Sequence, residues 1–169
     1  MSTVPLRVVV QPLTVEGFGA FGAVVEHGGG GRRRYLEAPF EADPHAPRPA
    51  FWVSRLGRAA QLPLPVTQLE RHPFTAQTFL PLSQVRYLVV VAPSQPDGAP
   101  DLAGLRAFIA GPGQGVVYRL GCWHHGLTVL DAPAEFAVMM ATSGQGDDDE
   151  FRDLPGAVEI HPAESARHG

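Results

Sequence analysis

The sequence predicts an all-β fold, a barrel or jelly roll of short strands with few helical residues. The chain contains 19 glycines and 17 prolines, which are spread along its length without a fixed period. Many turns between short strands account for this composition, whereas a collagen-like chain would be periodic. Because 44% of the 169 residues are hydrophobic, we expect a single domain over residues 1–169 with a substantial core.

Short segments along the chain show the apolar or β-branched pattern of strands, bounded by glycine, proline or polar turn residues. In chain order they are residues 6–10, 23–26, 51–56, 66–72, 85–92, 107–110, 116–118, 127–130, 135–140 and 158–160. The strongest is 85–92, in which Tyr87, Val89 and Val91 share one face. The residues between them are apolar too, and a strand that is apolar on both faces is buried on both sides.

Two brief helical segments are expected, Thr14–Phe21 and Asp101–Leu105, each with its first residue as N-cap. Gly17–Gly22 has the spacing G-x-G-x-x-G, but no strand directly precedes it and a β-like segment follows. A dinucleotide site needs the opposite order, so we interpret these residues as turn glycines. Residues 27–49, rich in glycine, proline and arginine, are expected to be the least structured part of the chain.

Charge and composition exclude several classes of protein. The net charge of -4 gives no electrostatic footprint for nucleic acid. No apolar stretch reaches the length of a membrane span, and Arg7 and Gln11 interrupt the early apolar run, so neither a membrane anchor nor a signal peptide is expected. A single cysteine, Cys122, rules out an intrachain disulfide and favours the cytoplasm. The acidic run Asp147–Glu150 is interpreted as a solvated loop.

Two segments carry residues suited to catalysis or metal binding. Glu70 and His72 lie two residues apart in a predicted strand, so they share a face and Arg71 points the other way. With Gln77 and His124 they form a candidate set of nitrogen and oxygen ligands for a divalent metal. Spacing alone also allows each histidine to be an ordinary hydrogen-bonded core residue.

Further candidates surround this set. In the pair His124–His125 only one side chain faces the barrel interior, and we expect it to be His124. Of Arg55 and Arg71, Arg55 is preferred for binding a substrate carboxylate, since a guanidinium pairs with it bidentately and Arg71 should point away from the interior. A surface salt bridge is the alternative role for Arg55. Tyr87 and Trp123 are added as candidate substrate contacts, and Gln77 is a candidate for this role as well as for metal binding. Cys122 beside His124 is not expected to be a nucleophile, because no third residue is placed to orient the pair.

The same segments resemble the ureidoglycolate lyase family of the cupin class. The matching residues are Leu62–Leu64, Leu69–Pro73, Gln77, Phe79, Val89–Ala92, Pro100–Leu102, Leu105–Ile109, Gly113–Tyr118 and Trp123–His125. Glu70-x-His72 followed by Gln77 is similar to the first cupin motif, and Gly121 to His124 is similar to the end of the second. The likeness covers roughly residues 8–154.

The resemblance implies a double-stranded β-helix barrel, a homodimer, and cleavage of the small carboxylate (S)-ureidoglycolate to glyoxylate and urea in allantoin catabolism. It also implies a divalent metal, with nickel the one associated with the family, and no nucleotide cofactor. His124 is then the candidate base, His72 the acid, and Glu70 the group that assists them. Within the family's pattern, Asp147–Asp149 replaces a common Asn-Cys-Asp, and Met140–Gln145 lacks a common arginine. A non-catalytic or differently specific cupin that binds a small carboxylate, and a cupin enzyme of other chemistry, are the alternatives.

Overall fold

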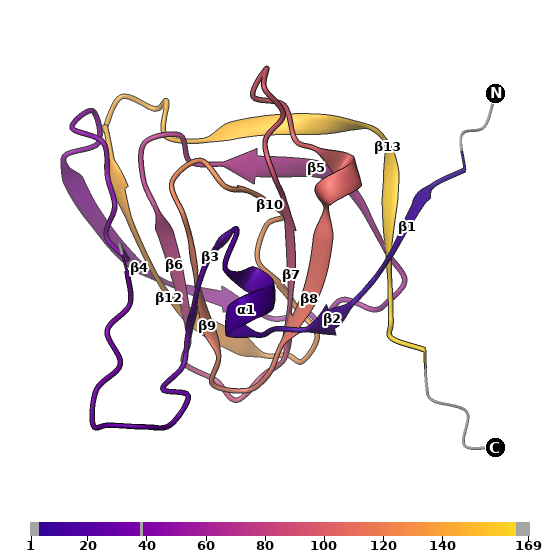
Figure 1. The fold of residues 1–169 in the computed structure, drawn as a ribbon, viewed down its shortest axis with the longest axis horizontal. Helices are drawn as coiled ribbons and strands as arrows, with labels where there is room; N and C mark the ends of the chain where they lie inside the picture. The colour runs from indigo at the N-terminus through magenta and orange to yellow at the C-terminus, as the bar shows by residue number, and fades with distance from the viewer. Residues whose placement is uncertain (1–3, 38, 165–169) are drawn as a thin grey trace.

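The computed structural model describes residues 4–37 and 39–164, which form two facing β-sheets that curl into a nearly closed barrel (Figure 1). The first sheet has the order β1-β13-β5-β10-β7-β8-β2, with β11 paired to β7, and the second has the order β3-β9-β6-β12-β4. The strands are β1 Leu6–Val9, β2 Gln11–Pro12, β3 Gly22–Val25, β4 Arg48–Leu56, β5 Leu64–Arg71, β6 Gln77–Pro81, β7 Tyr87–Ala92, β8 Arg106–Ala110, β9 Gly115–Tyr118, β10 Trp123–His124, β11 Thr128–Val129, β12 Ala134–Thr142 and β13 Glu150–His161. The predicted all-β barrel is confirmed, and its architecture is that of a cupin-like β-barrel.

Strand alternation divides the hydrophobic core into two clusters. Tyr87, Val89 and Val91 face the inside of the barrel, in one cluster with Phe136 of the opposite sheet. The residues between them on β7 belong to a second cluster, together with Trp123, on the outer face of the first sheet. Every residue of β7 is buried, as predicted for a strand that is apolar on both faces.

Neighbouring strands of the first sheet set the position of the candidate site. His124 in β10 lies opposite Glu70 in β5 on one side and opposite Val91 in β7 on the other. Gln77 is the first residue of β6 in the second sheet, and it pairs with Tyr118 of β9. The site therefore lies where the two sheets face each other, and the strand registers determine which side chains meet there.

The two short helices are capped as expected. α1 (Val15–Phe18) begins after Thr14, whose hydroxyl accepts a hydrogen bond from the Gly17 amide at 3.0 Å. The 3-10 helix η1 (Leu102–Gly104) begins after Asp101, whose carboxylate accepts one from the Ala103 amide at 3.0 Å. Among the described residues, no helix is long and apolar enough to cross a membrane.

Gly22 explains the glycine pattern that mimics a nucleotide-binding loop. It lies in β3 opposite Tyr118 of β9, and a Cβ atom there would lie 1.8 Å from the carbonyl oxygen of Val117. The close approach of two strands, rather than a phosphate, therefore requires glycine at this position.

Two predicted boundaries were wrong. β13 begins at Glu150, well before the expected start at residue 158, because a register shift between Asp153 and Val158 keeps the strand paired with β5 around Pro155. β4 starts at Arg48 rather than at the expected residue 51. Most of the described residues between 27 and 47 have no regular secondary structure, as expected, although Ala42 forms a β-bridge with Thr75 just before β6.

Candidate active site

Glu70, His72, Gln77 and His124, the four residues of the predicted set, meet at one place. Glu70, His72 and His124 each offer a ligand atom, and these atoms lie within 4.8 Å of one another. Gln77 joins them through its Oε1 atom, 3.0 Å from Nε2 of His72. Both histidines and Gln77 are buried, whereas the Glu70 side chain is 22% exposed and provides contact with solvent. The predicted shared face of Glu70 and His72 is confirmed.

The orientation of His124 is fixed from two sides. Its Nδ1 atom lies 2.9 Å from the carbonyl oxygen of Cys122, which can only accept a hydrogen bond, so Nδ1 carries a proton. The ring stacks on Tyr118, with 4.2 Å between centroids and 10° between planes. Nε2 therefore faces the site, 3.4 Å from Oε1 of Glu70. That contact is too poorly aligned for a hydrogen bond, so within the described residues Nε2 is a buried nitrogen without a hydrogen-bond partner.

His72 is held at both ring nitrogens. Nδ1 lies 2.8 Å from Oδ1 of Asp149 and 3.3 Å from the carbonyl oxygen of Asp148. Nε2 faces Gln77 on the interior side. The rings of His72 and His124 are 5.2 Å apart, so their inward nitrogens and the Glu70 carboxylate surround one small volume.

The ionisation of the neighbouring groups follows from their surroundings. Burial, the largest influence on Glu70, favours its neutral form, but the neighbouring rings of His124 and His72 outweigh it, and the pKa of Glu70 lies below its ordinary value. Burial raises the pKa of the Tyr118 hydroxyl well above its ordinary value. Burial also raises the pKa of the Cys122 thiol to about 12, so Cys122 remains a neutral thiol at neutral pH and is a poor nucleophile.

The donor set fits a divalent metal ion. A metal-binding histidine usually donates its outer N–H to a carboxylate or a backbone carbonyl, which leaves the inner nitrogen free to coordinate. His72 has Asp149 on its outer side and His124 has the Cys122 carbonyl. The unpartnered Nε2 of His124 beside the Glu70 carboxylate is the arrangement that a cation between them would satisfy.

Three sequence-predicted substrate contacts lie apart from this cluster. Arg55 is exposed and lies opposite Glu135, on the outer face of the second sheet. Trp123 is buried in the cluster outside the first sheet, beneath the guanidinium of Arg71 at 4.6 Å. Tyr87 is buried inside the barrel, but its hydroxyl donates to the Gln114 carbonyl oxygen at 2.8 Å. The structure therefore does not bring these three residues together with the four site residues.

Two residues of the site were not predicted as such from the sequence. Tyr118 was expected at the end of a strand and within a segment of the family resemblance, and nothing in its neighbourhood marks it as the partner of a histidine ring. Asp149 was expected in a solvated loop, and its side chain is indeed 51% exposed, but its contact with a buried histidine was not expected. In the structure Asp149 contacts His72, and Asp147 contacts His45 at 2.8 Å.

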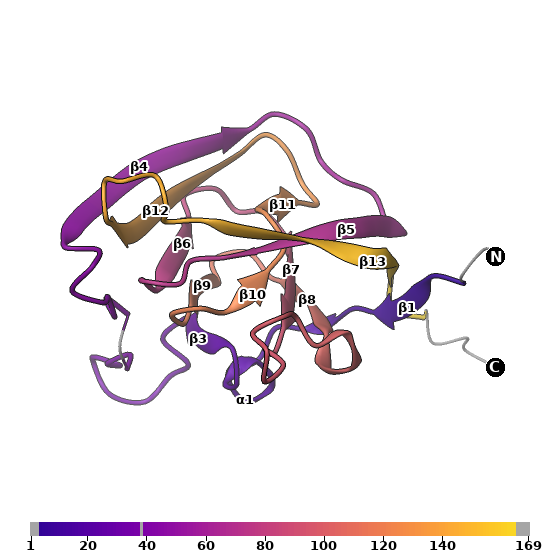
Figure 2. The same ribbon diagram turned by 90° about the horizontal axis from the view of Figure 1, so that it is seen from above.

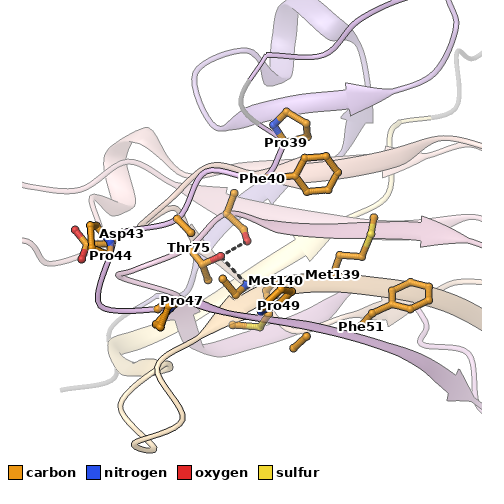
Figure 3. Close-up of a pocket in the computed structure, with 15 residues that line it drawn as sticks. Pro39, Phe40, Asp43, Pro44, Pro47, Pro49, Phe51, Thr75, Met139 and Met140 are labelled. Carbon is orange, nitrogen blue, oxygen red and sulfur yellow. Dashed lines mark hydrogen bonds between the residues drawn. The ribbon is translucent and has the colours of Figure 1, made fainter.

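A largely apolar cavity lies beside the site rather than in it. It has a volume of about 570 Å³, and Figure 3 shows Phe40, Phe51 and Met139 among the residues that line it. Met140 also lines it, and the Sδ atom of Met140 accepts a hydrogen bond from the Gln77 side chain at 3.5 Å. Among the described residues that line it, there is one carboxylate and no histidine, so its chemistry does not suit acid–base catalysis, and the polar cluster remains the candidate active site.

Fold and site together define a cupin-like barrel with a histidine–carboxylate centre. Residues 5–160 match the family model described as ureidoglycolate lyase. A ureidoglycolate lyase of Mesorhizobium japonicum is 36% identical over 163 residues, which cover 92% of this chain and 98% of that protein. A putative ureidoglycolate lyase of Agrobacterium fabrum is 37% identical over 141 residues, 83% of this chain and 86% of that protein. The chain belongs to the ureidoglycolate lyase family.

Proposed function

We propose that the protein is a ureidoglycolate lyase, which cleaves (S)-ureidoglycolate to glyoxylate and urea in allantoin catabolism. The observation that carries this proposal is the buried, unpartnered Nε2 of His124 beside Glu70 and His72. The family match over residues 5–160 supplies the substrate class. In reaction terms the protein is a carbon–nitrogen lyase of the amidine-lyase type.

The reaction requires one proton to leave an oxygen and another to reach a nitrogen. Ureidoglycolate carries a hydroxyl group and a ureido nitrogen on the same carbon. When the hydroxyl proton is removed, the electron pair forms the carbonyl of glyoxylate and the carbon–nitrogen bond breaks. The departing nitrogen takes up a proton to give urea. The site must therefore provide a base and an acid within hydrogen-bond distance of one carbon atom.

His124 is the proposed base. Its Nδ1 proton is directed to the Cys122 carbonyl, so in the neutral ring the lone pair is on Nε2, which faces the interior. When Nε2 takes the proton, the ring becomes positive, and the Glu70 carboxylate at 3.4 Å stabilises that charge. The lowered pKa of Glu70 keeps the carboxylate ionised for this role.

His72 is the proposed acid. In its charged form the ring pairs with the Asp149 carboxylate, donates from Nδ1 to the Asp148 carbonyl, and donates from Nε2 toward the interior, where Gln77 accepts in the absence of substrate. Transfer of the Nε2 proton to the ureido nitrogen completes the bond cleavage, and Gln77 then becomes a hydrogen-bond partner for the substrate. Arg55 lies on the outer face of the second sheet and does not face the site. We therefore assign no residue to the substrate carboxylate.

Glu70, His72, Gln77 and His124 would also hold a divalent metal ion, and nickel is the proposed one. The chemistry that a cation supplies in such a site is Lewis-acid polarisation of substrate oxygen atoms. Nε2 of His124 can carry either a proton or a cation, so its roles as base and as metal ligand are alternatives. A metal titration of the purified protein separates them.

We also propose that the protein is a homodimer and acts in the cytoplasm. β4 is an edge strand of the second sheet, where only β12 pairs with it among the described strands (Figure 2). Phe51 and Val53 on this strand are 68% and 56% exposed, and Phe40 nearby is 76% exposed. An apolar patch beside a free strand edge is typical of a symmetric interface. The cytoplasmic proposal rests on the single cysteine.

The test is glyoxylate release from (S)-ureidoglycolate by purified protein, with and without added nickel or manganese. Release in proportion to protein concentration, specific for the S enantiomer, is the expected result. If no glyoxylate appears under any metal condition, the proposed reaction is refuted, and binding of ureidoglycolate without turnover would identify a carboxylate-binding cupin instead.

A further inference from the structure

The acidic loop before β13 makes specific contacts on three sides. Asp147 forms an ion pair with His45, which lies shortly before β4, and accepts a hydrogen bond from the hydroxyl of Ser143. Asp149 reaches the buried ring of His72. At the end of the loop, Glu150 accepts a hydrogen bond from Arg71 at 2.7 Å. These contacts hold the loop against the end of β5 and the residue that follows it.

His72 is the one member of the four-residue site that does not lie in a strand. β5 ends at Arg71 and Pro73 follows, so the strand ladder does not fix the His72 backbone on either side. Its carbonyl oxygen accepts a hydrogen bond from the Gly121 amide at 2.9 Å, but this bond leaves the ring free to rotate. The direction of the ring must be set by side-chain contacts.

Different groups surround the two nitrogens of the His72 ring. At Nδ1 the Asp148 carbonyl accepts a hydrogen bond at 3.3 Å, and the Asp149 carboxylate forms an ion-pair contact at 2.8 Å, whereas the neutral Gln77 amide oxygen lies 3.0 Å from Nε2. A negative charge beside Nδ1 attracts a proton more strongly than a neutral amide oxygen beside Nε2 does. In the neutral ring the proton therefore resides on Nδ1, and Nε2 is the unprotonated nitrogen on the interior side.

We propose that Asp149 is a positioning residue, which orients His72 and holds its proton on Nδ1 so that Nε2 faces the site. The inference rests on the proposed function only for the identity of the substrate, because the position of the ring proton and the affinity for a cation are properties of the protein itself. The side chain of Asp149 is 51% exposed, so its contribution is to the direction of a buried ring and not to the packing of the core.

The first experiment measures Ni²⁺ affinity by calorimetry for the parent protein and for Asp149→Ala, Asp149→Asn and Asp147→Asn. Loss of an outer partner of a metal-binding histidine typically lowers metal affinity about 10- to 100-fold, and we expect Asp149→Ala to fall in that range. Asp149→Asn keeps an acceptor oxygen and should recover part of the affinity. Asp147→Asn is the matched control, because it removes one charge from the same loop without removing a contact to His72.

The second experiment needs neither metal nor substrate. Nitrogen NMR of histidine-labelled protein reads which ring nitrogen carries the proton, and the His72 signals are assigned by their absence in His72→Gln. We expect protonation at Nδ1 in the parent protein and a shift of the proton toward Nε2 in Asp149→Ala. An unchanged proton position, or a Ni²⁺ affinity within twofold of the parent, would overturn the proposal. An effect of Asp147→Asn equal to that of Asp149→Asn would also overturn it, since loss of charge alone would then be the cause.

The two proposals can fail separately. If the variants change the metal affinity and the His72 proton position while no protein releases glyoxylate, Asp149 positions His72 in a site with another substrate. If glyoxylate release is normal in Asp149→Ala as well as in the parent, the lyase is established and the positioning role is refuted.

Discussion

The substitution His124→Asn tests the role of the inward nitrogen, Nε2, while it keeps the hydrogen bond that the outer nitrogen, Nδ1, makes. The asparagine amide nitrogen can take the place of Nδ1 and keep the hydrogen bond to the Cys122 carbonyl, now 2.9 Å long. Nε2, the unpartnered inward atom, is lost. Removal of a general base typically costs about 10²- to 10⁴-fold in rate, so we expect kcat/KM for ureidoglycolate to fall by at least about 10²-fold.

The same substitution should leave the fold almost unchanged, because two effects on stability oppose each other. Loss of the ring stack on Tyr118 costs about 0.5–1.5 kcal/mol. Removal of a buried nitrogen that lacks a hydrogen bond relieves a penalty of about 1–3 kcal/mol. The net change should lie between a loss of about 0.5 kcal/mol and a gain of about 2.5 kcal/mol, which shifts the thermal midpoint by no more than about 10 °C for a chain of this size.

The assay is glyoxylate release, measured alongside a thermal unfolding curve for each protein. His125→Asn is the control, since it makes the same change at the neighbouring histidine, which is not among the three residues that share the ligand cluster. A His124→Asn protein with kcat/KM within tenfold of the parent would refute the role of Nε2. Equal losses in both variants would show that the effect does not depend on the inward nitrogen.

Three further outcomes follow from the structure. Because the pKa of Glu70 is lowered on folding, its charge stabilises the fold above pH about 4.5, and that stabilisation is lost as the pH falls through the lower folded value. The difference in thermal midpoint between the parent and Glu70→Gln should therefore narrow on acidification. A difference that does not depend on pH would contradict the assignment. Gly22→Ala would place Cβ 1.8 Å from the Val117 carbonyl oxygen, so urea unfolding should show a loss of about 3 kcal/mol or more, and a loss below about 1 kcal/mol would be inconsistent with that clash. Val53→Asp puts a charge into the exposed apolar patch and should convert the proposed dimer to a monomer in light scattering, whereas a variant that remains dimeric places the interface elsewhere.

Strand alternation made part of the site predictable from sequence. Alternation correctly predicted that Glu70 and His72 share a face, although β5 ends at Arg71 and His72 lies one residue beyond it. The same reasoning selects His124 over His125 as the inward residue. Alternation did not place Arg55, because the neighbouring Phe51, Trp52 and Val53 are all apolar. A strand with apolar residues on both faces does not reveal which face lies inside the barrel, and the arginine lies on the outer one.

The contacts of the acidic loop could not be predicted from the alternation of residues within one strand. Asp149 reaches His72 because β13 pairs with β5, and the start of β13 is obscured in the sequence by Pro155 and Gly156. Both residues normally interrupt a ladder, and the register shift that accommodates them cannot be read from residue types. The loop therefore appeared as a solvated acidic run although it touches a buried histidine.

The site thus has two kinds of support, and they should differ in their tolerance of change. Glu70, Gln77 and His124 lie on strands of two facing sheets, so their positions depend on registers that a single surface substitution does not alter. His72 lies outside the ladder and depends on Asp149, a half-exposed residue of a loop. Substitutions in that loop should therefore affect cation affinity and proton delivery by His72 before they affect unfolding, whereas substitutions in β5 or β10 should affect both together.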